Sequence, residues 1–131
     1  MQTKNIDLAY EKAVEALKSC SKPAGLYASG LPGGYEATWA RDSMITTLGA
    51  CLVGDTFKKA IKSSLELLSK NQSENGQIPN CVGSFNEDRQ SDVTFNSIDS
   101  SLWYIIGHFA YANAYGDLSL IEKYKNNIAK A

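Results

Sequence analysis

Two kinds of helix alternate along this chain, and the alternation limits the possible folds more than any other feature of the sequence. Apolar residues recur at helical spacing, i, i+3, i+4 and i+7, almost throughout. The segments at about 5–20, 56–71 and 118–128 combine an apolar stripe with a polar face, which is typical of outer helices. The segments at about 39–53 and 97–115 have little polar surface, which is typical of interior helices.

Long loops and short turns also alternate. Each interior helix follows a long loop, rich in Gly and Pro at 23–38 and rich in Gly, Asn, Asp and Ser at 72–96. Each turn from an interior to an outer helix is a short Gly-Asp pair, at 54–55 and 116–117, where the Asp can cap the next helix. This pattern predicts stacked α-hairpins whose long loops gather at one rim. We therefore expect an all-α fold of about five helices in a single domain over 1–131, with any site at that rim.

The composition excludes several classes of protein. Apolar residues make up 44% and charged residues 21% of the chain, which are ordinary globular values. Thirteen basic and fourteen acidic side chains leave no positive excess for phosphates, so we do not expect a nucleic-acid partner. No apolar run approaches about 18 residues, which argues against a membrane span.

The cysteines and the amino terminus indicate a compartment. Cys20, Cys51 and Cys81 are odd in number and form no CxxC pair, so we expect reduced thiols and neither a metal nor a cofactor. The first residues lack the apolar core of a signal peptide. These observations predict a cytoplasmic protein.

The start of the first interior helix carries a candidate sugar-binding group. Only two of the thirteen basic residues are Arg, Arg41 and Arg89, and Arg suits bidentate recognition where Lys suits a solvated surface. Trp39 offers a flat apolar face, while Arg41 and Asp42 can donate to and accept from neighbouring hydroxyls. The alternative is structural, because Asp42 complements a helix dipole and Arg41 can simply pair with an acid.

The start of the second interior helix carries a second carboxylate. Asp99 lies in the first turn of an otherwise uncharged helix, near Trp103 and at the same expected rim as Asp42. Two carboxylates facing one cleft suggest acid/base hydrolysis of a glycosidic bond. The alternative is again a helix-capping role. A helix start lowers the pKa of a carboxyl, so a general acid here would need burial against Trp103 or Trp39, or a like charge nearby.

Two further features are weaker. Gln77 and Asn80 can present hydrogen bonds from the second long loop, although the Gly and Pro around them also indicate a plain turn. His108 lies among apolar residues with no metal ligand at helical spacing, which indicates a core histidine.

Three segments, in this order and spacing, resemble a known family. They are WARDSMITTLGACLVGD at 39–55, ENGQIPNCVG at 74–83 and FNSIDSSLWYIIGHFAYANAYGD at 95–117. Together they are similar to the catalytic domain of amylo-alpha-1,6-glucosidase. More broadly they resemble the glucoamylase, trehalase and neutral-invertase clan of six-hairpin glycosidases.

The resemblance implies a fold and a mechanism. It implies part of an (α/α)6 toroid, in which Arg41 and Asp42 bind hydroxyls of the terminal sugar and Asp99 is the general acid. It also implies an inverting glycoside hydrolase acting on α-glucosidic bonds of glucan oligosaccharides. The family's general base is a Glu on a later segment, so we expect the base to be missing from this chain.

The helix count has a consequence for partners. About five helices cannot close a ring that needs roughly twelve, so the inner faces of the interior helices should be uncovered. We therefore expect the N-terminal portion of a larger glycosidase domain, or a chain that associates with itself, with an α-glucan or oligosaccharide as substrate. The alternative is a non-catalytic helical module that binds carbohydrate or another protein.

Overall fold

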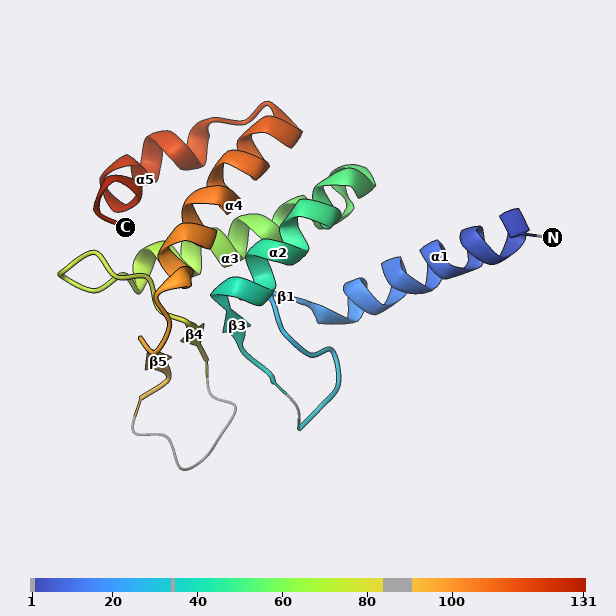
Figure 1. The fold of residues 1–131 in the computed structure, drawn as a ribbon, viewed down its shortest axis with the longest axis horizontal. Coiled ribbons are helices and arrows are strands. Elements are labelled where there is room, and N and C mark those ends of the chain that lie inside the picture. Colours follow the sequence, from blue (N-terminus) through green and yellow to red (C-terminus); the bar gives the residue numbers. More distant parts are fainter. Residues whose placement is uncertain (1, 34, 84–90) are drawn as a thin grey trace.

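A computed structural model describes residues 2–33, 35–83 and 91–131, so Arg89 lies outside the described residues. The chain is predominantly helical, as the sequence predicts, with the arrangement of part of a helical toroid (Figure 1). The helices are α1 (Gln2–Cys20), α2 (Ala40–Ala50), a 3-10 segment η1 (Cys51–Phe57), α3 (Lys58–Lys70), α4 (Asp99–Tyr115) and α5 (Ser119–Lys130). Short strands lie between them: β1 (Ser21–Lys22), β2 (Gly25–Leu26), β3 (Thr38–Trp39), β4 (Cys81–Val82) and β5 (Val93–Thr94).

The two interior helices pack against each other. α4 runs along α2, α3 contacts both of them, and α5 contacts α4 (Figure 1). The approach of α4 to α2 is close at Gly107, because a Cβ atom there would collide with the Met44 side chain. The absence of a side chain at this position therefore sets the spacing of the two helices.

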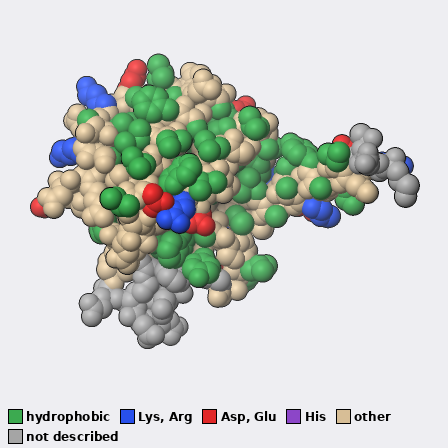
Figure 2. All heavy atoms as spheres, in the orientation of Figure 1, with side chains coloured by type: hydrophobic (Ala, Val, Ile, Leu, Met, Phe, Trp, Pro, Cys, Tyr) green, Lys and Arg blue, Asp and Glu red, His purple; other side chains and the backbone are tan. Residues whose placement is uncertain are grey.

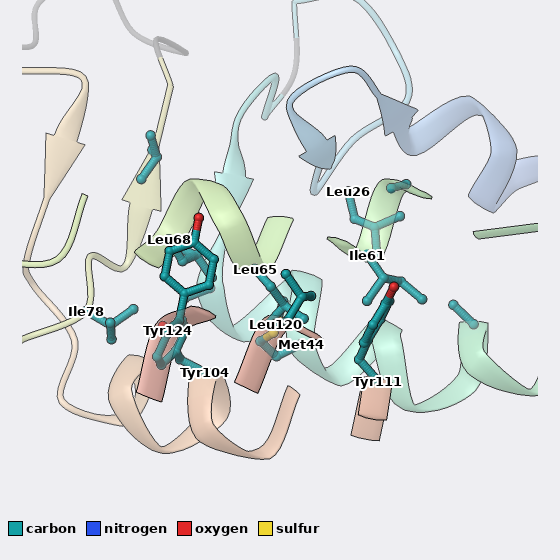
Figure 3. Packing of buried hydrophobic residues seen from close by; sticks show 14 of the residues in the cluster. Leu26, Met44, Ile61, Leu65, Leu68, Ile78, Tyr104, Tyr111, Leu120 and Tyr124 are labelled. Atoms are coloured by element: carbon teal, nitrogen blue, oxygen red, sulfur yellow. The ribbon is translucent and has the colours of Figure 1, made fainter. Parts of the chain in front are cut away.

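The core lies between these helices and α3. The predicted apolar stripe of α3 is buried as expected, since Phe57, Ile61, Leu65 and Leu68 are each at most 1% exposed. Figure 3 shows Leu65 among the buried residues of this cluster, which also receives Met44 from α2 and Leu120 from α5. Helical spacing was sufficient to identify this face because one side of α3 packs against the core and the other side faces solvent.

The turns between hairpins differ in how well they were predicted. Gly116 ends α4 in the left-handed conformation with φ of 60°. The Asp117 carboxylate accepts a hydrogen bond from the Ser119 N–H, although the N-cap position of α5 is Leu118. The helix expected at 39–53 instead ends at Ala50 and continues as η1. Asp55 caps nothing, because α3 begins at Lys58 with no side-chain cap.

The two long loops are not irregular throughout. β1 pairs antiparallel with β2, and β3, β4 and β5 form an antiparallel sheet in that order. In the latter, Trp39 lies opposite Cys81, and Cys81 lies opposite Thr94. Strands of two residues are too short to show an alternating pattern, which is why the sequence did not reveal them.

The segment at 5–20 is helical, as predicted, but most of its apolar stripe is not packed against the rest of the chain. α1 projects from the body of the molecule (Figure 1), and Ile6 and Tyr10 on its apolar stripe are 68% and 56% exposed. Only the last part of α1 meets the core, through Val14 and Leu17. No other described element covers the rest of the stripe.

The inner faces of the two interior helices are uncovered in this chain, as the helix count predicts. Leu48 on α2 is 42% exposed, and Leu102 and Phe109 on α4 are 63% and 55% exposed. Figure 2 shows apolar side chains gathered over this part of the surface. We call the set the inner face, and it comprises Ile45, Leu48, Leu102, Ile106 and Phe109. Among the described residues, no helix combines the length and apolar character needed to cross a membrane.

Candidate functional site

A hollow of about 400 Å³ lies where the predicted rim should be, between the starts of α2 and α4 and the two long loops. Its volume is within the range of small-molecule sites. The residues that line it are Ala28, Tyr35, Trp39, Arg41, Asp42, Asn80, Ser97 and Ser100. Four of the seven predicted site residues, namely Trp39, Arg41, Asp42 and Asn80, therefore share one concavity.

The three-stranded sheet fixes one wall of the hollow. The Asn80 backbone carbonyl accepts a hydrogen bond from the Ala40 N–H at 3.0 Å, and its own N–H donates to the Thr94 carbonyl at 2.8 Å. These bonds hold the second loop against the first residue of α2. Tyr35 meets Trp39 edge to face, with ring centroids 5.5 Å apart, so two aromatic rings stand side by side at the mouth.

An ion pair joins the starts of the two interior helices at the edge of the hollow. Arg41 Nε lies 2.5 Å from Asp99 Oδ2, and the Ser97 hydroxyl donates to Asp99 Oδ1. The Arg41 and Asp99 side chains are 60% and 27% exposed, so the pair is accessible to solvent.

The ion pair lowers the pKa of Asp99. The hydrogen bond from Arg41, followed by that from Ser97, lowers the pKa of Asp99 from 3.8 to about 2. The same contact raises the pKa of Arg41, and the nearby Asp42 charge adds to this effect. Asp99 is therefore an ionised carboxylate at neutral pH in this arrangement. The alternative that Arg41 pairs with an acid is correct.

Ser97 contacts Asp99 and does not cap α4. The helix begins at Asp99 with Ile98 at the N-cap position, and no side chain caps its first turn. The Ser97 hydroxyl donates to the Asp99 carboxylate. A charged acceptor of this kind forms a stronger hydrogen bond than a neutral one.

The remaining predicted residues lie outside this hollow. Asp99 contacts it through Arg41 and Ser97 without being among its lining residues. Gln77 lines a second hollow on the other side of Ser97. Trp103 is partly buried and packs against the core cluster, so it does not face the candidate sugar site.

Sequence reasoning missed several lining residues. Tyr35 stands in the Gly-rich first loop, and an aromatic residue in such a loop was the signal that could have identified it. Ser100 is 1% exposed, and its hydroxyl has no hydrogen-bond partner among the described residues. Its position, one residue after Asp99, was the only indication in the sequence. Within the described ranges, no three His, Cys, Asp or Glu side chains group as a metal site would require.

Comparison with known proteins agrees with this geometry. A sequence model of the amylo-alpha-1,6-glucosidase family matches residues 14–131. No curated protein and no solved structure gives a match. The matched range contains every residue that lines the hollow, and it leaves out the projecting first part of α1.

Proposed function

The chain belongs to the amylo-alpha-1,6-glucosidase family, and from this premise we propose that it forms part of a glycoside hydrolase acting on α-glucosidic bonds of glucan oligosaccharides. The observation that carries the proposal is the placing of Trp39, Arg41 and Asp42 around one sugar-sized hollow. We further propose that residues 1–131 are the N-terminal portion of an (α/α)6 catalytic domain.

The hollow offers the groups that a terminal glucose unit requires. The Trp39 and Tyr35 rings provide apolar surface for the C–H groups of a pyranose. Arg41 donates and Asp42 accepts, so together they satisfy adjacent hydroxyls. Asn80, fixed by its backbone hydrogen bonds, adds an amide at the same mouth. A few placed polar groups in a mostly apolar concavity are typical of small-molecule sites.

The proposed acid role of Asp99 requires a change in its partner. A general acid must carry a proton before it protonates the leaving oxygen, and Arg41 keeps Asp99 ionised. We propose that sugar hydroxyls draw the Arg41 guanidinium toward the substrate and away from Asp99. Release from Arg41 alone returns the pKa of Asp99 only to about 3.8. The bound sugar would therefore also have to bury the carboxyl and raise its pKa further, so that Asp99 takes up a proton from water and transfers it to the leaving oxygen. An inverting reaction also needs a carboxylate base that activates water, which we assign to a segment outside this chain.

A second candidate function follows from the same ion pair. Because Asp99 is ionised and paired with Arg41, the hollow as it stands fits binding without turnover. The chain would then be a non-catalytic carbohydrate-binding module derived from the same fold.

Glucose release and binding distinguish these candidates. The chain, and any longer protein that contains it, would be incubated with maltose, isomaltose, trehalose and sucrose, while calorimetry measures binding. We expect Asp99→Asn to abolish turnover and Asp55→Asn, an exposed acid at the opposite end of the α2 hairpin, to preserve it. Binding without turnover in the longer protein favours the module. Turnover unchanged in Asp99→Asn removes the acid role, and absence of both binding and turnover overturns both candidates.

The inner face supports a proposal about partners. The chain exposes 7911 Å², whereas a compact monomer of 14.3 kDa exposes about 6,800 Å². The projecting α1 accounts for part of this excess, and the exposed apolar side chains of the inner face account for another part. We propose that further helical hairpins cover the inner face in a longer protein and that the chain on its own associates with itself.

We also propose a cytoplasmic location. Cys20, Cys51 and Cys81 all have free thiols, and reduced thiols suit that compartment.

A further inference from the structure

Three serines lie at or just before the start of α4, and their hydroxyl groups have different surroundings. The Ser97 hydroxyl donates to Asp99 Oδ1, and the Ser101 hydroxyl accepts a hydrogen bond from the Ile78 N–H at 3.3 Å. The Ser100 side chain is buried, and its hydroxyl has no hydrogen-bond partner among the described residues. Ser100 therefore differs from both neighbours in keeping a free donor and acceptor.

A buried hydroxyl without a partner is unfavourable for the folded chain. The Ser100 hydroxyl loses its hydrogen bonds to water on folding, and the described residues supply none in return. The methyl group of an alanine side chain would fill nearly the same space without this cost. The packing of α4 therefore does not explain why position 100 carries a hydroxyl.

The position of Ser100 indicates what can satisfy this hydroxyl. Ser100 lines the hollow of about 400 Å³, as do Trp39 and Asp42. Rotation about the Cα–Cβ bond moves a serine oxygen between three staggered positions and requires no movement of the backbone. A ligand in the hollow can therefore engage the Ser100 hydroxyl after a change of one side-chain angle.

Other polar side chains of the hollow are already engaged. Arg41 pairs with Asp99, and Asn80 Oδ1 accepts a hydrogen bond from the Asn96 N–H at 2.8 Å. A ligand that recruits these groups competes with bonds that the chain has already formed. The Ser100 hydroxyl breaks no such bond when it turns to a ligand, so its new hydrogen bond is not offset by the loss of an old one.

We propose that Ser100 is a specificity-determining residue of the hollow, whose hydroxyl turns toward the ligand and forms a hydrogen bond with one hydroxyl group of the bound sugar. This inference rests on the proposed function. A ligand that lacks the matching hydroxyl leaves Ser100 unpaired, as it is in the unliganded chain, and binds more weakly. Ser100 thus makes the hollow selective among sugars that differ in a single hydroxyl group.

A double-mutant cycle between protein and ligand tests this role. Calorimetry compares the affinities of the unmodified chain and of Ser100→Ala for glucose and for a series of deoxyglucoses, each of which lacks one hydroxyl. We expect Ser100→Ala to bind glucose about tenfold more weakly, the factor that one good hydrogen bond provides. One deoxyglucose should bind the unmodified chain about tenfold more weakly than glucose and should lose nothing further in Ser100→Ala.

Stability gives a second readout, which a purely structural role would move in the opposite direction. Ser100→Ala should leave the denaturant midpoint unchanged or raise it, because no hydrogen bond within the chain is lost. Ser101→Ala removes the acceptor of the Ile78 N–H, so it should lower the midpoint and preserve glucose affinity. Thr38→Val removes another buried hydroxyl that has no partner among the described residues but lies outside the lining, so it should also preserve glucose affinity.

The outcomes separate this inference from the proposed function. Equal glucose affinity in the unmodified chain and in Ser100→Ala overturns the role of Ser100 and leaves the hollow as a sugar site. A loss of the same size for glucose and for every deoxyglucose also overturns it, because the substitution would then act through packing. A lower denaturant midpoint in Ser100→Ala would show that the hydroxyl serves the fold. Absence of glucose binding to the unmodified chain overturns the proposed function together with this inference.

Discussion

Arg41 on α2 and Asp99 on α4 are in contact at 2.5 Å between Nε and Oδ2, although 58 residues separate them in the sequence. The pair ties together the starts of the two inner helices at the edge of the candidate sugar site. It also depresses the pKa of Asp99, the group to which the proposed acid role is assigned.

Removing the guanidinium should release Asp99. We expect Arg41→Gln to raise the pKa of Asp99 from about 2 toward its ordinary value of 3.8, because the charge-assisted hydrogen bond is the first cause of the depression. An NMR titration of the side-chain carboxyl measures this pKa. Lys123→Gln breaks a different exposed ion pair, with Glu66, and should leave Asp99 unchanged. An Asp99 pKa that stays near 2 in Arg41→Gln would contradict the assigned cause.

The same pair should be visible in acid stability. A carboxyl whose folded pKa is depressed stabilises the fold above its unfolded pKa and loses that contribution as the pH falls through the folded pKa. For Asp99 the window runs from about pH 4 down to about pH 2. Denaturant unfolding at both ends of this window should show a smaller loss for Arg41→Gln than for the unmodified chain. Equal losses would show that the pair contributes nothing.

Two helical glycines should respond in opposite directions to alanine. At Gly107 a Cβ atom collides with the Met44 side chain in the core, so Gly107→Ala should lower the free energy of unfolding by about 1–2 kcal/mol after its gain in helix propensity. At Gly49 nothing lies within 4 Å of that Cβ position, so Gly49→Ala should raise the free energy by up to about 1 kcal/mol. Denaturant titration measures both. Stabilisation by Gly107→Ala would contradict the close packing of α2 and α4.

The single histidine should make the fold sensitive to mild acid. Burial lowers the pKa of His108, which lies between the rings of Tyr104 and Tyr124 and whose Nδ1 is 3.1 Å from the Tyr104 carbonyl oxygen. The histidine therefore binds a proton more readily in the unfolded chain than in the folded chain. The free energy of unfolding should fall as the pH drops below about 6.5. His108→Gln should flatten this dependence between pH 7 and pH 5, as measured by denaturant titration. An unchanged slope would assign the effect to other groups.

The inner face should govern the oligomeric state of the isolated chain. Leu102 and Phe109 are 63% and 55% exposed on α4, and an apolar patch of this kind favours association. Light scattering after size exclusion should show a species larger than the monomer. Leu102→Lys combined with Phe109→Lys should return the chain to a monomer. Leu31 on the first long loop is also exposed. It lies outside the inner face, so Leu31→Lys should leave the association unchanged.

A monomeric chain before any substitution would contradict self-association through the inner face. The assignment would also fail if the double variant stayed associated, since the contact would then lie on another surface. Retention of helix content in the double variant is the necessary control.

Local periodicity was enough to predict the helices and part of the core. The apolar stripe of Phe57, Ile61, Leu65 and Leu68 is buried because one side of this helix packs against the core and the other faces solvent. The helical spacing of apolar and polar residues shows this directly in the sequence. α1 shows the same kind of stripe and leaves most of it exposed. A stripe predicts that a face is suited to burial, and whether another element covers that face depends on tertiary structure.

The candidate site was predictable in position and not in its contacts. The Gly-rich loops before the inner helices indicated a rim, where Trp39, Arg41, Asp42 and Asn80 indeed meet. The pairing of Arg41 with Asp99 depends on the distance between two segments that lie far apart in the chain. The hydrogen bond from Ser97 to Asp99 depends on the side-chain orientation of Ser97, which helical spacing does not reveal. Trp103 was expected near the sugar and packs toward the core, because helical rotation decides which side of α4 it occupies.

The sheet of β3, β4 and β5 has a consequence for anyone who would alter specificity by exchanging loops. Trp39 is paired with Cys81, and Cys81 with Thr94, so a graft that changes the length of one segment shifts the register of its neighbours. The three segments should therefore be exchanged together. A transplanted loop positions its aromatic or amide side chain in the hollow only if its strand partners are transplanted with it.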